Sequence, residues 1–157
     1  MRRMNNHFDS DAAAFGAKGA LLGLDHGEKT IGIAVCDPER RVAAPVETIR
    51  RKKFTVDANA LSAIANERAI VGVILGLPLN MDGSEGPRAQ SVRAFARNLK
   101  TVLPLPVAFW DERLSTAAME RDSIAMGDSR ARRAEKIDER AATFILQGAI
   151  DRLRNGR

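Results

Sequence analysis

Two short apolar runs, residues 20–24 and 31–35, flank the polar segment 26–30. This pattern predicts a β-hairpin in which Gly27 gives the turn a permissive backbone. Both runs are apolar on both faces, as is typical of central strands that are covered on both sides. Asp25 ends the first run, where a buried carboxylate needs a cation or hydrogen-bond donors. It is therefore either a turn residue that accepts bonds from loop amides or a metal ligand at the edge of the sheet.

The hydrophobic pattern after the hairpin changes from period two to helical spacing and back. Residues 42–49 predict a third strand, which Pro45 breaks or places at an edge. Residues 54–68 carry apolar positions at helical spacing, and residues 69–75 form a continuous β-branched run typical of a buried parallel strand. A strand, a helix and a strand in succession imply a right-handed crossover.

The second half of the chain predicts three more helices and a fifth strand. The loop 76–83 follows a parallel strand at its carboxyl end, where α/β sheets bind ligands. Ser84 is the expected N-cap of the next helix, with Pro87 in the first turn. A strand over 107–110 leads to Asp111 and Glu112, and a helix capped by Ser115 or Thr116 runs to about residue 126. A basic loop over 127–135 precedes the last helix, residues 136–154.

This order predicts an α/β domain whose five-stranded mixed sheet begins with three antiparallel strands, continues with parallel strands and is flanked by helices. The 157 residues are 45% apolar and 29% charged, which suits one globular domain over residues 20–157. Residues 1–19 lack the continuous apolar region of a signal peptide, so we expect them to be a disordered extension. Because Cys36 is the single cysteine, the chain cannot form an internal disulfide, which suits a cytoplasmic protein. Cys36 lies in an apolar run, so we expect it to be a core residue.

The net charge of +5 is compatible with a polyanionic partner, and no apolar run is long enough for a membrane span. Basic residues gather at 50–53 and again at Arg130, Arg132 and Arg133. Each cluster is either a solvated loop or part of a phosphate track. The second cluster leads directly into Asp138, which begins the predicted last helix and borders its apolar face. A carboxylate there either favours the helix dipole or joins a site.

Four segments together resemble the YqgF/RuvX family. They are LGLDHGEKTIGIA (22–34) followed by Asp37, GLPLNMDG (76–83), DERLST (111–116), and Ile137-Asp138 with Ala141-Ala142 and Ile145-Leu146. The resemblance runs from about residue 21 to about residue 153. It implies an RNase H-like fold related to Holliday-junction resolvases and a nuclease activity on pre-16S rRNA. Thr30 departs from the arginine that the family often has, which weakens a phosphate contact but leaves the ligands intact.

Three carboxylates, Asp25, Glu112 and Asp138, follow strand ends or begin a helix and are the expected catalytic metal ligands. Two carboxylates about 4 Å apart repel by roughly 4 kcal/mol at an effective dielectric near 20, so converging acids need a cation. Oxygen-only ligation favours Mg²⁺ or Mn²⁺ over zinc. Asp111 is the alternative to Glu112, because neighbouring strand residues face opposite sides and both sides are apolar here. The longer reach of glutamate favours Glu112, and Asp111 would then cap the following turn.

Three further polar residues near these carboxylates are candidate substrate contacts. Lys29 and Arg113 could hold phosphates, although Arg113 could instead pair with a neighbouring carboxylate. Asn80 could meet a phosphate or a ribose hydroxyl, or only turn its loop. Arg130, Arg132 and Arg133 complete the expected substrate-binding set.

The resemblance implies a hydrolase that processes the 5′ end of pre-16S rRNA. The alternatives are a resolvase of branched DNA, a nucleic-acid-binding module without catalysis, and an actin-like or sugar-kinase ATPase, for which the chain is short. The expected partner is structured RNA, such as pre-rRNA, or branched DNA, and the expected oligomeric state is a monomer or a weak homodimer.

Overall fold

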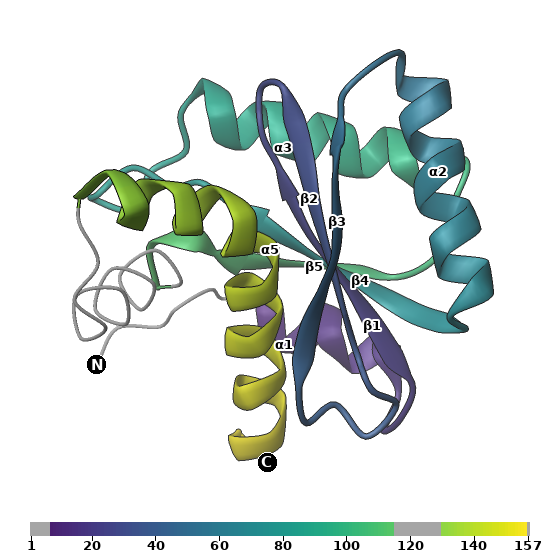
Figure 1. Cartoon of the computed structure of the whole chain (residues 1–157). Coiled ribbons are helices and arrows are strands. Elements are labelled where there is room, and N and C mark those ends of the chain that lie inside the picture. The colour runs from purple at the N-terminus through teal and green to yellow at the C-terminus, as the bar shows by residue number, and fades with distance from the viewer. Residues whose placement is uncertain (1–6, 115–129, 157) are drawn as a thin grey trace.

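The computed structural model describes the backbone of residues 7–114 and 130–156, and side chains over 7–114 and 140–156 (Figure 1). Its centre is a five-stranded sheet of order β3-β2-β1-β4-β5. β1 pairs antiparallel with β2 and parallel with β4; β2 also pairs antiparallel with β3, and β4 parallel with β5. The strands are β1 (Ala20–His26), β2 (Thr30–Cys36), β3 (Ala43–Arg50), β4 (Ile70–Leu77) and β5 (Val107–Asp111). This is the mixed sheet that the sequence predicts.

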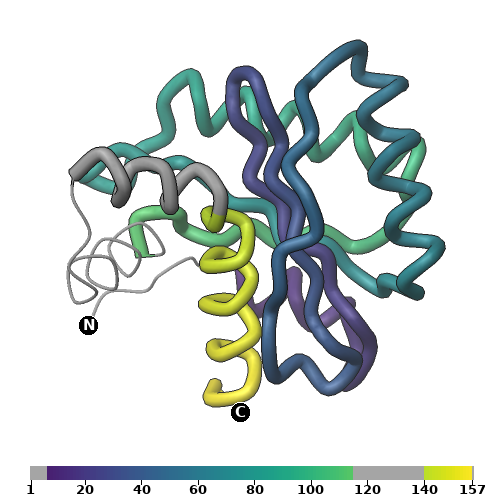
Figure 2. The backbone as a smooth tube through the Cα atoms, in the orientation of Figure 1, coloured from purple at the N-terminus to yellow at the C-terminus, as the bar shows by residue number. Residues whose placement is uncertain are grey.

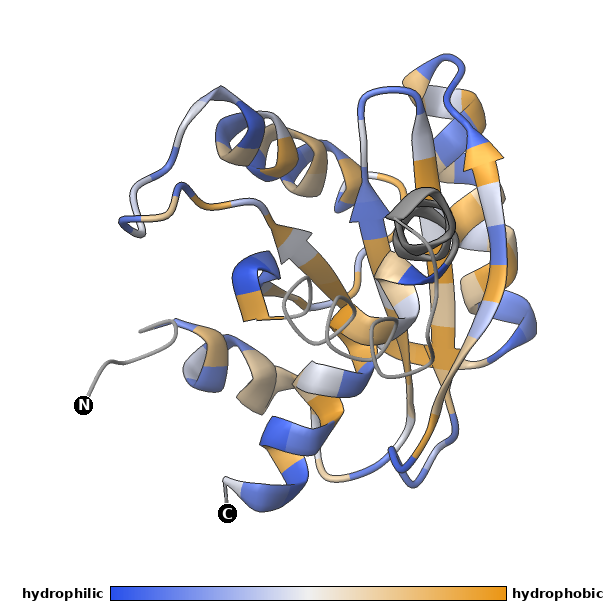
Figure 3. Ribbon diagram, turned by 60° about the vertical axis from the view of Figure 1, so that its left-hand side comes forward, coloured by the Kyte–Doolittle hydropathy of each residue, from blue (hydrophilic) through white to orange (hydrophobic). Residues whose placement is uncertain are grey.

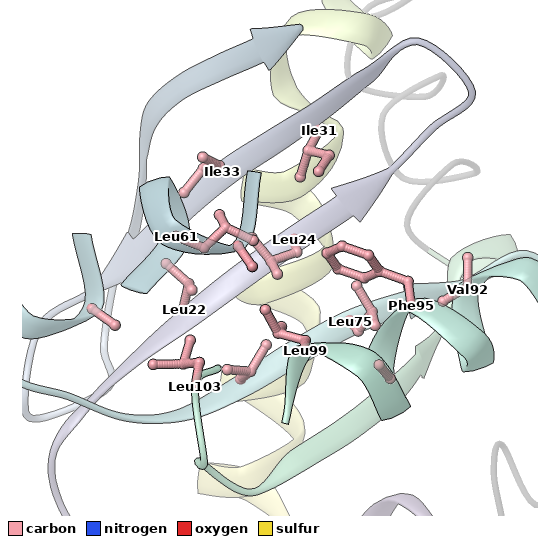
Figure 4. Close-up of a cluster of buried hydrophobic side chains, with 14 of the residues drawn as sticks. Leu22, Leu24, Ile31, Ile33, Leu61, Leu75, Val92, Phe95, Leu99 and Leu103 are labelled. Carbon is pink, nitrogen blue, oxygen red and sulfur yellow. The ribbon is translucent and has the colours of Figure 1, made fainter. Parts of the chain in front are cut away.

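Helices cover both faces of the sheet. On one face, α2 (Phe54–Glu67) and α3 (Pro87–Leu99) bury their apolar stripes in a cluster with Leu22, Leu24 and Leu75 (Figure 4). On the other face, α5 (Arg130–Asn155) lies against β1, β2 and β3 (Figure 2) and shares a second cluster with α1 (Phe8–Ala12). Figure 3 shows the orange strands between helices striped in blue and orange. Strand side chains alternate between the two clusters, so the identity of a residue's neighbours tells which face it occupies.

Glycines let α5 approach the sheet closely. A Cβ built on Gly23 would lie 2.7 Å from Leu146 Cβ, and one on Gly76 would lie 2.6 Å from Ile145 Cδ1. A Cβ on Gly32 would make an ordinary contact of 3.5 Å with Ala142 Cβ. These three glycines lie on β1, β4 and β2, next to one another in the sheet. A side chain at Gly23 would push α5 away from the strands, whereas one at Gly76 would displace the end of the Ile145 side chain and the Glu112 carboxylate.

The N-terminal segment differs from the expected disordered extension. Residues 8–15 form α1 and a short 3-10 helix (Ala13–Phe15), and both Phe8 and Phe15 are buried. Phe8 meets Trp110 edge to face, with ring centroids 5.2 Å apart. The buried guanidinium of Arg40 donates hydrogen bonds to the carbonyls of residues 15, 16, 18 and 19. Two aromatic anchors, Phe8 and Phe15, thus order a segment whose content of Ala, Asn and Gly predicts disorder, and that prediction is wrong for residues 8–15.

Several predicted boundaries also change. α3 has Gly86 as its N-cap and Pro87 as its first residue, while Ser84 belongs to the preceding turn. α5 begins at Arg130, so the loop predicted over 127–135 is helical from Arg130 onward. The helix predicted after residue 115 lies outside the described residues. Cys36 is buried, as expected for a core residue. Within the described chain, no helix is both long and apolar enough to span a bilayer.

Candidate functional site

Asp25 lies near the end of β1 on the face that α5 covers. It pairs across the sheet with Gly32 of β2, and a Cβ on that glycine would lie 3.6 Å from Asp25 Cβ and 3.5 Å from Ala142 Cβ of α5. Because Gly32 carries no side chain, the Asp25 side chain has room at this end of the sheet. The next residue, His26, points to the opposite face, where its ring stacks on Phe95 of α3 with centroids 4.2 Å apart.

Glu112 follows β5 directly and leans over β4 on the same face as Asp25. A Cβ built on Gly76 would lie 2.8 Å from Glu112 Oε2 and 2.9 Å from its Cγ, so the missing side chain makes room for the carboxylate. Oε2 is buried and has no hydrogen-bond partner among the described residues. Burial, followed by the charge of Asp25, raises the pKa of Glu112 to about 7, against a smaller lowering by Arg88. Asp25 and Glu112 are therefore close enough to repel.

Asp111 lies on the other side of β5, and both of its carboxylate oxygens already accept hydrogen bonds. It is buried, and the Arg113 guanidinium donates to both of its oxygens, with Nη2 2.6 Å from Oδ2. The backbone N–H of Arg113 also donates to Oδ1 at 3.0 Å. The sequence pattern does not choose between Asp111 and Glu112. The structure directs Glu112 toward the face of Asp25 and gives Asp111 an ion pair and a turn.

Arg113 and Asn80 both make internal contacts. Arg113 Nη1 donates to the carbonyl of Met81 at 2.9 Å and fixes the loop after β4 to the end of β5. Asn80 closes the same loop, since its Nδ2 donates to Ser84 Oγ at 2.9 Å and its N–H to the Ser84 carbonyl. The ion pair of Arg113 and the turn role of Asn80 are the alternatives that the sequence leaves open for these two residues.

Asp138 is a position in the interior of α5, two turns after the helix begins. It precedes Ala142 by one turn, and Ala142 Cβ would lie 3.5 Å from a Cβ built on Gly32. A charge at a helix N-terminus is therefore not the explanation for this aspartate. The side chains of Asp138 and of Arg130, Arg132 and Arg133 lie outside the described part. The side chains that are described contain no group of three candidate metal-ligating residues.

The pair of carboxylates fits a hard divalent cation. A buried carboxylate oxygen without a donor, next to a second carboxylate, is costly unless a cation neutralises both. Oxygen donors suit Mg²⁺ and Mn²⁺. His26, the histidine beside the pair, faces away from it, and its buried ring has a pKa lowered to about 4. The donor set does not suggest zinc.

One cation near the site has no counterpart among the expected residues. Arg88, in the first turn of α3, donates from Nη2 to the His26 carbonyl at 3.1 Å and lowers the pKa of Glu112. Its position directly after the loop that follows β4 is a usable sequence signal, because that loop lies at the carboxyl edge of the sheet. Lys29 lies exposed on the turn between β1 and β2, on the same edge.

The family model described as "RuvX: Holliday junction resolvase" matches residues 19–152. A protein of Bradyrhizobium sp. named "Putative pre-16S rRNA nuclease" is 66% identical over 90% of this chain and 88% of its own length. A protein of the same name from Nitrobacter winogradskyi is 66% identical over 93% and 90%. The structure of T. thermophilus RuvC with a Holliday junction substrate aligns at a TM-score of 0.56 and 12% identity, over 87% of this chain and 97% of RuvC. That likeness shows the RNase H-like fold, and the chain belongs to the RuvX family of Holliday-junction-resolvase-like nucleases.

Proposed function

We propose that this protein is a divalent-metal-dependent endonuclease that hydrolyses phosphodiester bonds at the 5′ end of pre-16S rRNA. The observation that carries the proposal is the pair Asp25 and Glu112 at the carboxyl edge of the parallel strands, where Glu112 Oε2 has no hydrogen-bond partner among the described residues. The names of the relatives, at 66% identity over most of both chains, supply the substrate.

Asp25, Glu112 and Asp138 are the residues that would hold Mg²⁺ or Mn²⁺. Such ions, when bound, polarise a phosphoryl oxygen and activate water. The chain itself contributes the orientation. Gly76 leaves the space that Glu112 occupies, and the pairing of β1 with β2 fixes Asp25 beside Gly32. Lys29 on the adjoining turn offers a positive charge to a phosphate.

The decisive experiment compares two substrates under the same conditions. One is an RNA that contains the 5′ leader and the first stem of 16S rRNA; the other is a four-way DNA junction. Each is incubated with Mg²⁺, Mn²⁺ or EDTA, with Asp25→Asn as the inactive control. We expect metal-dependent cleavage of the RNA by the wild type only. Cleavage equal to that of Asp25→Asn would refute the nuclease and leave a binding module.

A junction resolvase is the second candidate, because the family model carries that description. A resolvase needs two active sites, whereas an rRNA-processing nuclease can act as a monomer. Sedimentation of the protein, alone and with each substrate, therefore belongs to the same experiment. Symmetric cuts of the junction by a dimer, with intact RNA, would favour the resolvase.

A further inference from the structure

Two arginines from different elements bind three consecutive carbonyls at the end of β1. Arg88 Nη2, from α3, donates to His26 O at 3.1 Å. Arg51 Nη1, from the segment after β3, donates to Gly27 O at 2.8 Å and to Glu28 O at 3.1 Å. Neighbouring residues are about 3.8 Å apart along the chain, so the two guanidinium groups lie within roughly 10 Å of each other. Each guanidinium has further N–H groups beyond those used in these bonds.

Among the residues that the structure describes, no acidic side chain forms an ion pair with Arg51 or Arg88. Within the described residues, Arg93, Arg113 and Arg152 pair with carboxylates at 2.6–2.7 Å, whereas Arg51 and Arg88 form no such ion pair. The nearby carboxylate of Asp57 accepts from the backbone N–H of Lys52 instead. Both arginine side chains belong to exposed residues. An exposed, unneutralised pair of guanidinium groups beside a carboxylate site is suited to phosphate.

The groups around Arg51 and Arg88 indicate which of the two arginines lies nearer the carboxylates. His26 lies beneath both arginines, and after burial their charges are the main causes that lower its pKa to about 4. The ring is thus neutral and packed on Phe95, and it adds no charge of its own. Arg88 bonds the carbonyl of His26, the residue directly after Asp25, and its charge also lowers the pKa of Glu112. Arg51 bonds the carbonyls of the next two residues, Gly27 and Glu28, and so lies farther out along the turn between β1 and β2.

We infer that Arg88 and Arg51 form a phosphate track that leads the RNA strand away from the Asp25–Glu112 site across the β1–β2 turn. The inference rests on the proposed function, since it assigns the path of that substrate. Arg88 binds the phosphate closer to the cut and Arg51 the one beyond it. Lys29, next to Glu28 on the same turn, extends the positive surface. Recognition of this kind is independent of base sequence.

The test is binding of a single-stranded RNA in EDTA, where cleavage is absent, across a range of NaCl concentrations. Arg51→Gln and Arg88→Gln should each weaken binding about tenfold and make the slope of log K against log salt shallower by about 0.7, and the double variant by about 1.4. Arg97→Gln removes the same charge from the last turn of α3 and should change neither quantity beyond general screening. Arg51→Lys is the control for a turn that needs a cation in order to fold. It keeps the positive charge and should restore most of the slope of log K against log salt.

A second measurement separates contact from scaffolding. Single methylphosphonate substitutions in the RNA remove one phosphate charge at a time. Neutralising the phosphate that Arg88 binds should cost the wild type affinity and cost Arg88→Gln nothing further. The proposed track would be refuted if Arg51→Gln and Arg88→Gln bound the RNA with the same affinity and the same salt slope as Arg97→Gln. Wild-type binding and metal-dependent cleavage would then still support the nuclease. Conversely, tight salt-dependent binding that needs both arginines, without cleavage, would overturn the nuclease and keep the track.

Discussion

Replacing Glu112 by glutamine should make the metal-free protein more stable above neutral pH. Burial and the charge of Asp25 raise the pKa of Glu112 from 4.5 to about 7 in the folded chain. The unfolded chain ionises near the ordinary value, so between these two pH values the folded state binds more protons. The free energy of unfolding therefore falls as pH rises from about 4.5 to about 7 and stays low above that. Glutamine has the same shape but no charge to bury.

The size of the effect follows from the shift. One pKa unit corresponds to about 1.4 kcal/mol. The shift of Glu112, allowing for its partial exposure, corresponds to about 2–3 kcal/mol of stability that the wild type loses and Glu112→Gln keeps. Urea unfolding in EDTA at pH 5, 6, 7, 8 and 9 measures it. Glu28→Gln, at an exposed position on the β1–β2 turn, is the matched control and should follow the wild type.

Metal should reverse the difference. At pH 8, Mg²⁺ at about 100 times its dissociation constant stabilises a folded protein by about 2.7 kcal/mol. We expect that gain in the wild type and little of it in Glu112→Gln. Parallel stability curves for the two proteins from pH 5 to pH 9, or equal stabilisation by Mg²⁺, would show that Glu112 is not a buried carboxylate facing a cation.

The other predictions concern the groups around Glu112 and the N-terminal helix. Asp25→Asn should lower RNA cleavage about 100-fold or more with an unchanged circular dichroism spectrum. Gly76→Ala should cost about 1–3 kcal/mol in urea unfolding and reduce cleavage, because its Cβ would displace the Glu112 carboxylate and the end of the Ile145 side chain. Asp111→Asn should lower the melting temperature by about 4–8 °C in calorimetry, as expected for a loss of about 2 kcal/mol, while Mg²⁺ still binds. Phe8→Ala should cost about 3–5 kcal/mol; no change would mean that α1 adds nothing to the core.

The sheet was predictable from sequence because all of its strands except the edge strand β3 are short apolar runs bounded by turns. The hairpin, the crossover and the buried strand before residue 76 all follow from periodicity and from the hand of βαβ connections. Order at the N-terminus was not predictable, because it depends on two separate aromatic residues, Phe8 and Phe15, and on the distant Arg40. Contacts far apart in the chain leave no local period.

The choice between Asp111 and Glu112 shows what a stronger sequence signal would have been. Period two divides β5 into two sets of residues, and both sets are apolar, so alternation alone cannot say which set shares a face with Asp25. Glycines can identify that face, because a glycine in a strand often marks the face where another element comes close. In β1, Gly23 has the same parity as Asp25, and both occupy the face covered by α5. In β4, Gly76 marks that face too, since its partner Trp110 belongs to the cluster that α5 covers. Glu112 follows the end of β5, and its side chain lies over Gly76 on the same face. The room for the Glu112 carboxylate and the identity of the candidate ligand thus share one structural cause, the absence of a side chain at residue 76, while Gly23 on the same face lets α5 approach the sheet.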